Sequence, residues 1–109
     1  MNIAAEAALI ASLDDVDYLL GNVNKIITER DRMFELINGL PSVKAWPSHG
    51  NYLMCEFHKN EAERVYVELA TQGIFVRNFN SPRLRDCFRI AVGTSSDTDK
   101  LIAAMKAIV

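Results

Sequence analysis

Apolar residues recur along the first third of the chain at spacings of three, four and seven, the pattern of one helix face. This stripe consists of Leu13, Val16, Leu20, Val23, Ile27, Phe34 and Ile37. We expect one long amphipathic helix that ends near Asn38, because Gly39 and Pro41 stop it. Such a helix measures on the order of 40 Å, so part of it is expected to project beyond a small domain. Gly21 and Asn22 mark a candidate bend.

The segment before this helix, NIAAEAALIASL, is rich in alanine and apolar nearly all round. It predicts a short helix that needs cover on several sides. Ser12 is expected to cap the long helix, with Asp15 three residues on as its partner in a capping box. Asp14 and Asp17 suit the positive end of that helix, and a catalytic carboxylate pair is the alternative interpretation of these acids.

The remainder of the chain predicts four strands and two helices. Strands are expected in VKAW, NYLMCEF, IFVR and CFRIAVG. Asn60 with Glu63 predicts the start of the first of these helices and Gly73 its end. Two overlapping cap signals, Thr94 with Asp97 and Ser96 with Asp99, predict the start of the last helix. The order β-β-α-β-β-α predicts an α+β fold, a largely antiparallel sheet with helices on one side.

Each of these elements has an expected buried face. The apolar residues that we expect to point into the core are Leu53, Cys55 and Phe57 on the second strand, Phe88, Ile90 and Val92 on the last strand, Ala62, Val65, Leu69 and Ala70 on the first of the two helices, and Leu101, Met105 and Ile108 on the last. Cys55 and Cys87 are expected to be reduced core cysteines. His49 and His58 are expected in loops, and no metal site is expected.

Length and charge limit the possible functions. The chain has 109 residues, half of them hydrophobic, enough for one compact core and too few for two. A net charge of −2 and scattered basic residues give no general attraction to nucleic acid. No apolar run is long enough to cross a membrane and the start lacks signal-peptide features, so we expect a cytoplasmic protein with no membrane partner.

Two arginines are the most informative polar residues, Arg77 at the end of GIFVR and Arg89 within FRIAVGT. Arg89 shares its strand face with the small residues Cys87, Ala91 and Gly93. A buried unpaired charge is costly, so Arg89 requires either a carboxylate partner, such as Asp86 or Glu56, or a bound anion. Guanidinium groups bind carboxylate and phosphate through two parallel hydrogen bonds, and a second nearby arginine favours an anion pocket.

The stretches SHGNYLMCEF and LATQGIFVRNFNSPRLRDCFRIAVGT, with a closing helix, resemble the C-terminal small domain of the histidinol-phosphate aminotransferase family. The resemblance covers nearly the whole chain, and its specific parts are GIFVRNFNSP, FRIAVGT and the N-Y-L strand start. It implies a class I/II aminotransferase of the aspartate aminotransferase fold with pyridoxal 5′-phosphate as cofactor. Related enzymes such as threonine-phosphate decarboxylase share some of these elements, so histidinol phosphate, threonine phosphate and an aromatic amino acid all stay open as substrates.

The resemblance also implies roles for individual residues. Arg89 matches the arginine that holds the substrate's α-carboxylate when an amino acid such as glutamate is bound, and Arg77 matches one that helps to hold the phosphate of histidinol phosphate. Asn51, which opens a strand that approaches the pocket, is a further candidate contact. The reaction implied is transamination between histidinol phosphate and 2-oxoglutarate in histidine biosynthesis, with no catalytic residue in this chain.

The lysine that carries the cofactor in this family has no counterpart here. None of the chain's lysines stands in a context that resembles the family's Ser-x-x-Lys motif: Lys25, Lys44, Lys59, Lys100 and Lys106. We therefore expect an excised C-terminal domain, inactive alone, with Met1 an added start. Residues 1–12 then belong to the edge of a missing large domain of the same protein, 13–40 form an interdomain helix and 41–109 the small domain. The complete enzyme is expected to be a homodimer.

Two other classes of function stay open on the residues alone. A freestanding α+β regulatory module that binds a small anionic metabolite would also explain the two arginines, since the strand and helix order resembles half of a ferredoxin-like fold. A structural domain that dimerises through the long helix would explain that helix but not the arginines.

Overall fold

The computed structural model describes residues 2–109, so Met1 and its expected role as an added start lie outside the described residues. The elements follow in the order α1 (Ile3–Asp14), α2 (Val16–Asn38), β1 (Val43–Ala45), β2 (Tyr52–Phe57), α3 (Glu61–Thr71), β3 (Arg77–Asn78), β4 (Cys87–Ala91) and α4 (Ser95–Ile108). The predicted order of strands and helices is therefore confirmed.

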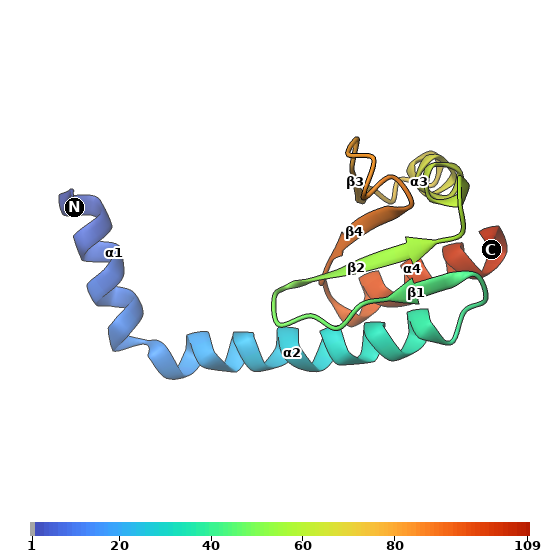
Figure 1. Ribbon diagram of the computed structural model, residues 1–109. Helices are drawn as coiled ribbons and strands as arrows, with labels where there is room; N and C mark the ends of the chain where they lie inside the picture. Colours follow the sequence, from blue (N-terminus) through green and yellow to red (C-terminus); the bar gives the residue numbers. More distant parts are fainter. Residues whose placement is uncertain (1) are drawn as a thin grey trace.

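The four strands form one sheet in the order β1-β2-β4-β3, and every neighbouring pair is antiparallel. β4 consequently lies inside the sheet, between β2 and β3, as Figure 1 shows. The third strand is shorter than the predicted IFVR, because only Arg77 and Asn78 join the ladder. Ile74 and Val76, which precede it, pack against the core instead.

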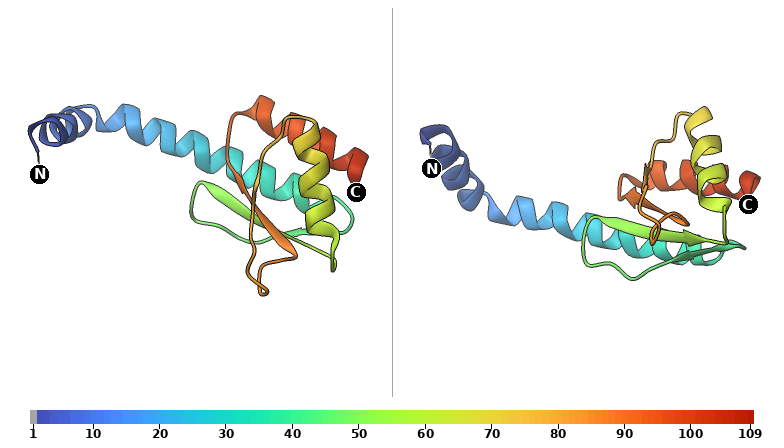
Figure 2. Two further views of the ribbon diagram at one scale, coloured as in Figure 1. Left: turned by 90° about the horizontal axis from the view of Figure 1, so that it is seen from above. Right: turned by 45° about the horizontal axis from the view of Figure 1, so that its top comes forward.

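One face of the sheet carries the core. Leu53 lies opposite Ile90 and Cys55 opposite Phe88, so these side chains share the face that α2, α3 and α4 cover. In Figure 1 the sheet lies in front of α4, and Figure 2 shows α2 and α4 passing close to each other. The predicted layer of helices on one side is confirmed.

Burial raises the pKa of the Cys55 thiol to about 12, so this thiol stays protonated at neutral pH.

The long helix projects from the domain, as its length predicted. α2 has 23 residues and is about 35 Å long, yet its buried residues, Glu29, Met33 and Ile37, all lie in its second half. The first part of the apolar stripe, from Leu13 to Val23, is exposed, and α1 buries no residue at all. Figure 1 shows α1 and the first half of α2 extending away from the sheet.

Two of the predicted helix starts are wrong in detail. Ser12 lies within α1, whose alanine-rich sequence continues the helix to Asp14, and α2 is capped at Asp15 without a side-chain hydrogen bond. Asn60 does stand at the N-cap of α3, but its φ of 68° is left-handed. A capping side chain requires an extended backbone, so Asn60 forms no cap bond.

Other local signals are confirmed. Thr94 and Asp97 form the reciprocal capping box of α4. Gly73 follows α3 with a φ of 77°, a left-handed conformation that glycine adopts without strain. The chain turns at Asp15, whereas α2 continues through the predicted bend at Gly21. Within residues 2–109, no helix is long and apolar enough to span a bilayer.

Candidate functional site

Arg77 and Arg89 face each other across the β3–β4 pair, on the side of the sheet away from the helices. Phe88 and Ile90 point into the core, so the intervening Arg89 points outward by strand alternation. Residues directly opposite on antiparallel strands have their Cβ atoms about 5 Å apart, and like charges there repel each other. The structure thus brings together two positive side chains that the sequence only places twelve residues apart.

The local acids considered as partners for Arg89 are occupied elsewhere. Glu56 accepts a hydrogen bond from the indole nitrogen of Trp46 at 3.2 Å, and Asp86 accepts one from the backbone N–H of Asn60 at 3.1 Å. Among residues 2–109, no ion pair involves Arg77 or Arg89. The structural alternative, an arginine paired to a neighbouring acid, is therefore wrong for this chain.

Each arginine instead stands over an aromatic ring. The guanidinium carbon of Arg89 lies 5.0 Å from the ring centroid of Tyr52, and that of Arg77 lies 5.7 Å from the ring of Phe79. Tyr52 was not predicted as a site residue. Its position two residues before Met54 places it on the arginine face, but only the pairing of Met54 with Arg89 shows that the two side chains are diagonal neighbours.

Asn51, the third predicted site residue, lies at the end of the sheet. Its backbone carbonyl accepts a hydrogen bond from Val92 N–H at 2.8 Å, which ties the start of β2 to the end of β4. Arg89 pairs with Met54, three residues further along β2, so the two backbones are separated by about 10 Å along the strand. The structure therefore brings the two arginines together and leaves Asn51 apart from them, just before β2 at the end of the sheet.

A buried carboxylate joins α2 to the start of α4. Glu29 accepts hydrogen bonds from Arg32 at 2.6 Å and from the Ser95 hydroxyl at 2.9 Å, and Arg32 also pairs with Asp99. Burial alone would raise the pKa of Glu29, but these hydrogen bonds outweigh it and the pKa is lowered. The Thr98 hydroxyl forms no hydrogen bond among residues 2–109, so it is the bonds from Ser95 and Arg32 that lower the pKa of Glu29.

The lowered pKa of Glu29 predicts an acid-sensitive domain. Because the folded-state pKa lies below the ordinary value of 4.5, ionised Glu29 stabilises the fold above that pH, and this contribution is lost as the pH falls through the lowered pKa. Glu29→Gln is expected to lower stability at pH 7 by about 1 kcal/mol and to reduce its loss between about pH 5 and pH 3. Urea unfolding at several pH values measures both effects.

The exposed Glu35 on the same helix provides a matched control, and Glu35→Gln is expected to leave the acid dependence unchanged. Part of that dependence remains in either variant, because the hydrogen bond that the Asp97 carboxylate accepts from the backbone N–H of Thr94 also lowers the pKa of Asp97. Equal pH dependence in the Glu29→Gln variant and the original chain would contradict the role given to Glu29.

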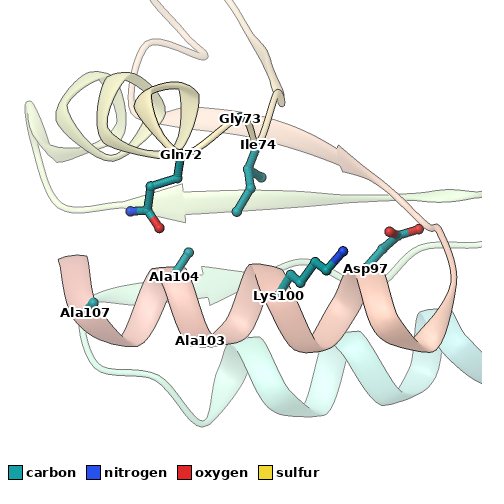
Figure 3. Close-up of a pocket in the computed structure, with 8 residues that line it drawn as sticks. All are labelled: Gln72, Gly73, Ile74, Asp97, Lys100, Ala103, Ala104 and Ala107. Carbon is teal, nitrogen blue, oxygen red and sulfur yellow. The ribbon is translucent and has the colours of Figure 1, made fainter.

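A separate groove lies in another part of the molecule. It has a volume of about 740 Å³ and runs between the end of α3 and α4, lined by Gln72, Gly73, Ile74, Asp97, Lys100, Ala103, Ala104 and Ala107. Figure 3 shows Gln72 and Ile74 facing the small alanine side chains of α4. Neither arginine lines this groove, which lies in the helix layer. It therefore belongs to a different part of the molecule from the arginine face.

The residues of this chain do not form the site for the cofactor that the sequence implied. Its five lysines are all exposed. Four of them lie on helices or in a turn: Lys25 on α2, Lys59 before α3, and Lys100 and Lys106 on α4. Lys44, on β1, lies over the ring of Trp46 at 3.8 Å. A lysine that binds pyridoxal phosphate covalently needs an enclosed pocket. The lysines of residues 2–109 are all exposed instead, so none of them fits this role.

Known proteins resemble the chain along almost its full length. The model of the family described as aminotransferase class I and II matches residues 1–105. A histidinol-phosphate aminotransferase from Roseiflexus castenholzii is 39% identical over 111 residues, which cover 99% of this chain and 30% of that relative. A second histidinol-phosphate aminotransferase, from Dehalococcoides mccartyi, is 37% identical over 105 residues, which cover 96% of this chain and 29% of that relative.

Solved structures share the fold. The histidinol-phosphate aminotransferase from Sinorhizobium meliloti in complex with pyridoxal-5′-phosphate aligns with a TM-score of 0.83 at 30% identity, over 94% of this chain and 28% of that one. A decarboxylase from Sulfurospirillum multivorans aligns with a TM-score of 0.85 at 25% identity, over 99% of this chain and 32% of that one. The predicted α+β fold of an aminotransferase small domain is confirmed.

The chain spans 30% of the length of the Roseiflexus castenholzii relative and similar shares of the others. The matches nevertheless include α1, α2 and the whole sheet, so they support the resemblance seen in the sequence and confirm pyridoxal phosphate as the cofactor of the family. On this evidence, the chain belongs to the aminotransferase class I and II family.

Proposed function

We propose that this chain is the substrate-anchoring, C-terminal small domain of a pyridoxal-phosphate-dependent aminotransferase that acts on histidinol phosphate and 2-oxoglutarate, a step of histidine biosynthesis. The observation that carries the proposal is the pair of arginines that face each other on β3 and β4 without a carboxylate partner among residues 2–109. Two opposed positive charges repel each other unless an anion lies between or beside them. The names of the relatives support the choice of substrate.

The two arginines fit the two anions that such an enzyme must hold in turn. Arg89, on an inner strand over the ring of Tyr52, holds the α-carboxylate of glutamate or 2-oxoglutarate through two parallel hydrogen bonds. Arg77, on the edge strand, holds the phosphate of histidinol phosphate. Asn51, just before β2, is a further candidate contact. Fixing the anionic end of each substrate in this way orients its reacting amine or carbonyl group and helps to exclude water.

The uncovered apolar surface fits a missing large domain of the same protein. α1 buries none of its side chains, and the exposed apolar residues of α1 and the first half of α2 include Ile10, Leu13, Val16, Leu20 and Val23. Such surface is normally covered by another domain or chain. We accordingly assign residues 1–12 to the edge of the large domain, 13–40 to the interdomain helix and 41–109 to the small domain, in a protein that is a homodimer when complete.

An assay of the complete protein with three amino donors tests the proposal. With 2-oxoglutarate and added pyridoxal phosphate, histidinol phosphate is expected to give a kcat/KM at least about 100-fold above that of phenylalanine. The reason is that histidinol phosphate has a phosphate for Arg77 to bind and phenylalanine has none. The 109-residue chain alone is expected to give no turnover. Preferred use of threonine phosphate with release of carbon dioxide would instead identify a decarboxylase and contradict the proposed substrate.

A further inference from the structure

The arginine face contains one feature that the anchoring role leaves unexplained, the ring of Tyr52 against Arg89. Arg89 has no ion-pair partner among residues 2–109, and the only group that the structure gives it is this ring, with 5.0 Å between the guanidinium carbon and the ring centroid. Tyr52 pairs with Ala91, two residues beyond Arg89 on β4, so the two side chains are diagonal neighbours on one face. A guanidinium over the face of a ring is attracted to it, and this attraction favours one orientation of its hydrogen-bonding edge.

The ring is fixed in turn by the glycine that precedes β2. A Cβ atom placed on Gly50 would lie 2.8 Å from Cε1 of Tyr52, closer than real Cβ atoms approach, and 3.2 Å from Cδ1 of the same ring. The ring edge therefore lies directly against the backbone of Gly50. Any larger residue at position 50 would displace the ring and with it the support of the guanidinium.

Gly50 itself is held from two directions. Its carbonyl accepts a hydrogen bond from the Arg30 guanidinium at 3.1 Å, and its N–H donates to the Ser48 hydroxyl at 3.1 Å. Arg30 belongs to α2, and its side chain is only 13% exposed, although it lies 20 residues before Gly50 in the chain. A continuous set of contacts thus runs from the long helix through Gly50 and Tyr52 to Arg89.

We propose that Tyr52 is the positioning residue of Arg89, and that Gly50, held by Arg30, fixes the Tyr52 ring so that the guanidinium is oriented before the substrate anion arrives. This inference rests on the proposed role of Arg89 as the carboxylate anchor. The ring, not the hydroxyl, carries the effect, because the Tyr52 hydroxyl has no hydrogen-bond partner in the part of the chain that the structure describes. Tyr52 is 39% exposed, so its replacement removes little core packing.

The test measures glutamate KM and kcat in the complete protein, together with the Kd for glutarate, a dicarboxylate that carries no amine and does not react. Tyr52→Leu is expected to raise both the KM and the Kd about five- to tenfold, the size of a partly desolvated cation–π contact, with kcat changed less than about twofold. Tyr52→Phe retains the ring and is expected to stay within about twofold of the original protein in both constants. Gly50→Ala is expected to weaken binding in the same direction as Tyr52→Leu.

The outcomes separate this inference from the function on which it rests. Unchanged KM and Kd in Tyr52→Leu, in a protein where Arg89→Ala weakens binding, overturn the positioning role and leave the anchor in place. Equal losses in Tyr52→Phe and Tyr52→Leu also overturn it, since the ring would then not be the cause. If Arg89→Ala itself leaves both constants unchanged, the anchor and the positioning role fall together.

Discussion

Replacing Arg89 with alanine in the complete protein is expected to raise the KM for glutamate at least about 30-fold. Removal of one partner of a hydrogen-bonded charge pair costs about 2–5 kcal/mol, and about 1.4 kcal/mol corresponds to a tenfold change in binding. The loss is expected in KM more than in kcat, because the carboxylate is held both before and during the reaction. Steady-state kinetics with varied glutamate measure the effect.

Two further variants make this measurement specific. Arg89→Lys keeps the positive charge but loses the paired hydrogen bonds. Its KM is therefore expected to lie between that of the original protein and that of Arg89→Ala. Arg83, which is exposed in the loop before β4 and outside the sheet, provides the matched control. Arg83→Ala is expected to leave KM unchanged. An unaltered KM in Arg89→Ala, or an equal rise in Arg83→Ala, would remove Arg89 from the substrate site.

Phe88→Ala is expected to cause the largest loss of stability, about 3–5 kcal/mol, a large part of the net stability of a small domain. Phe88 is fully buried, and its ring packs against that of Phe57 with 4.8 Å between centroids in a tilted arrangement. It also lies on the inner strand, beside Arg89, so its loss leaves a cavity under the centre of the sheet. Urea unfolding followed by the fluorescence of Trp46, the single tryptophan of the chain, measures the change.

Phe75 offers the same substitution in a contrasting setting. Its side chain is 78% exposed, so Phe75→Ala is expected to change the free energy of unfolding by no more than about 0.5 kcal/mol. Similar losses in Phe88→Ala and Phe75→Ala would mean that the core is not centred on the β2–β4 pair as described.

Much of the local structure follows from short stretches of sequence. Helix ends at Gly39 and Gly73, the capping box of Thr94 and Asp97, and the alternation along β2 depend on residues within a few positions of each other, so their signals are readable without the fold. The predicted start of α2 at Ser12 is wrong, because the capping signal of Ser12 competes with an alanine-rich segment that continues α1. Where a capping signal and a helix-forming segment overlap, the difference in free energy between the two conformations decides which one forms. The sequence pattern does not give this difference.

Glu29 illustrates a residue that sequence patterns do not reveal. It stands between apolar positions of the predicted stripe and looks like a solvated charge, yet it is buried against α4. Its burial depends on Ser95, 66 residues away, and on Arg32, which also reaches Asp99. Partners that are distant in the chain are brought together only by the packing of α2 on α4.

For this protein the sequence alone determined the α+β order, the arginines as candidate anion ligands and the resemblance to a family, because strand and helix periodicity and short motifs are local properties. The tertiary structure decided that Arg77 lies opposite Arg89, that no acid neutralises them among residues 2–109, and that Tyr52 and Gly50 support one of them. These facts depend on strand register. Register is fixed by the packing of the whole core, since a slip of one residue would turn every side chain to the other face.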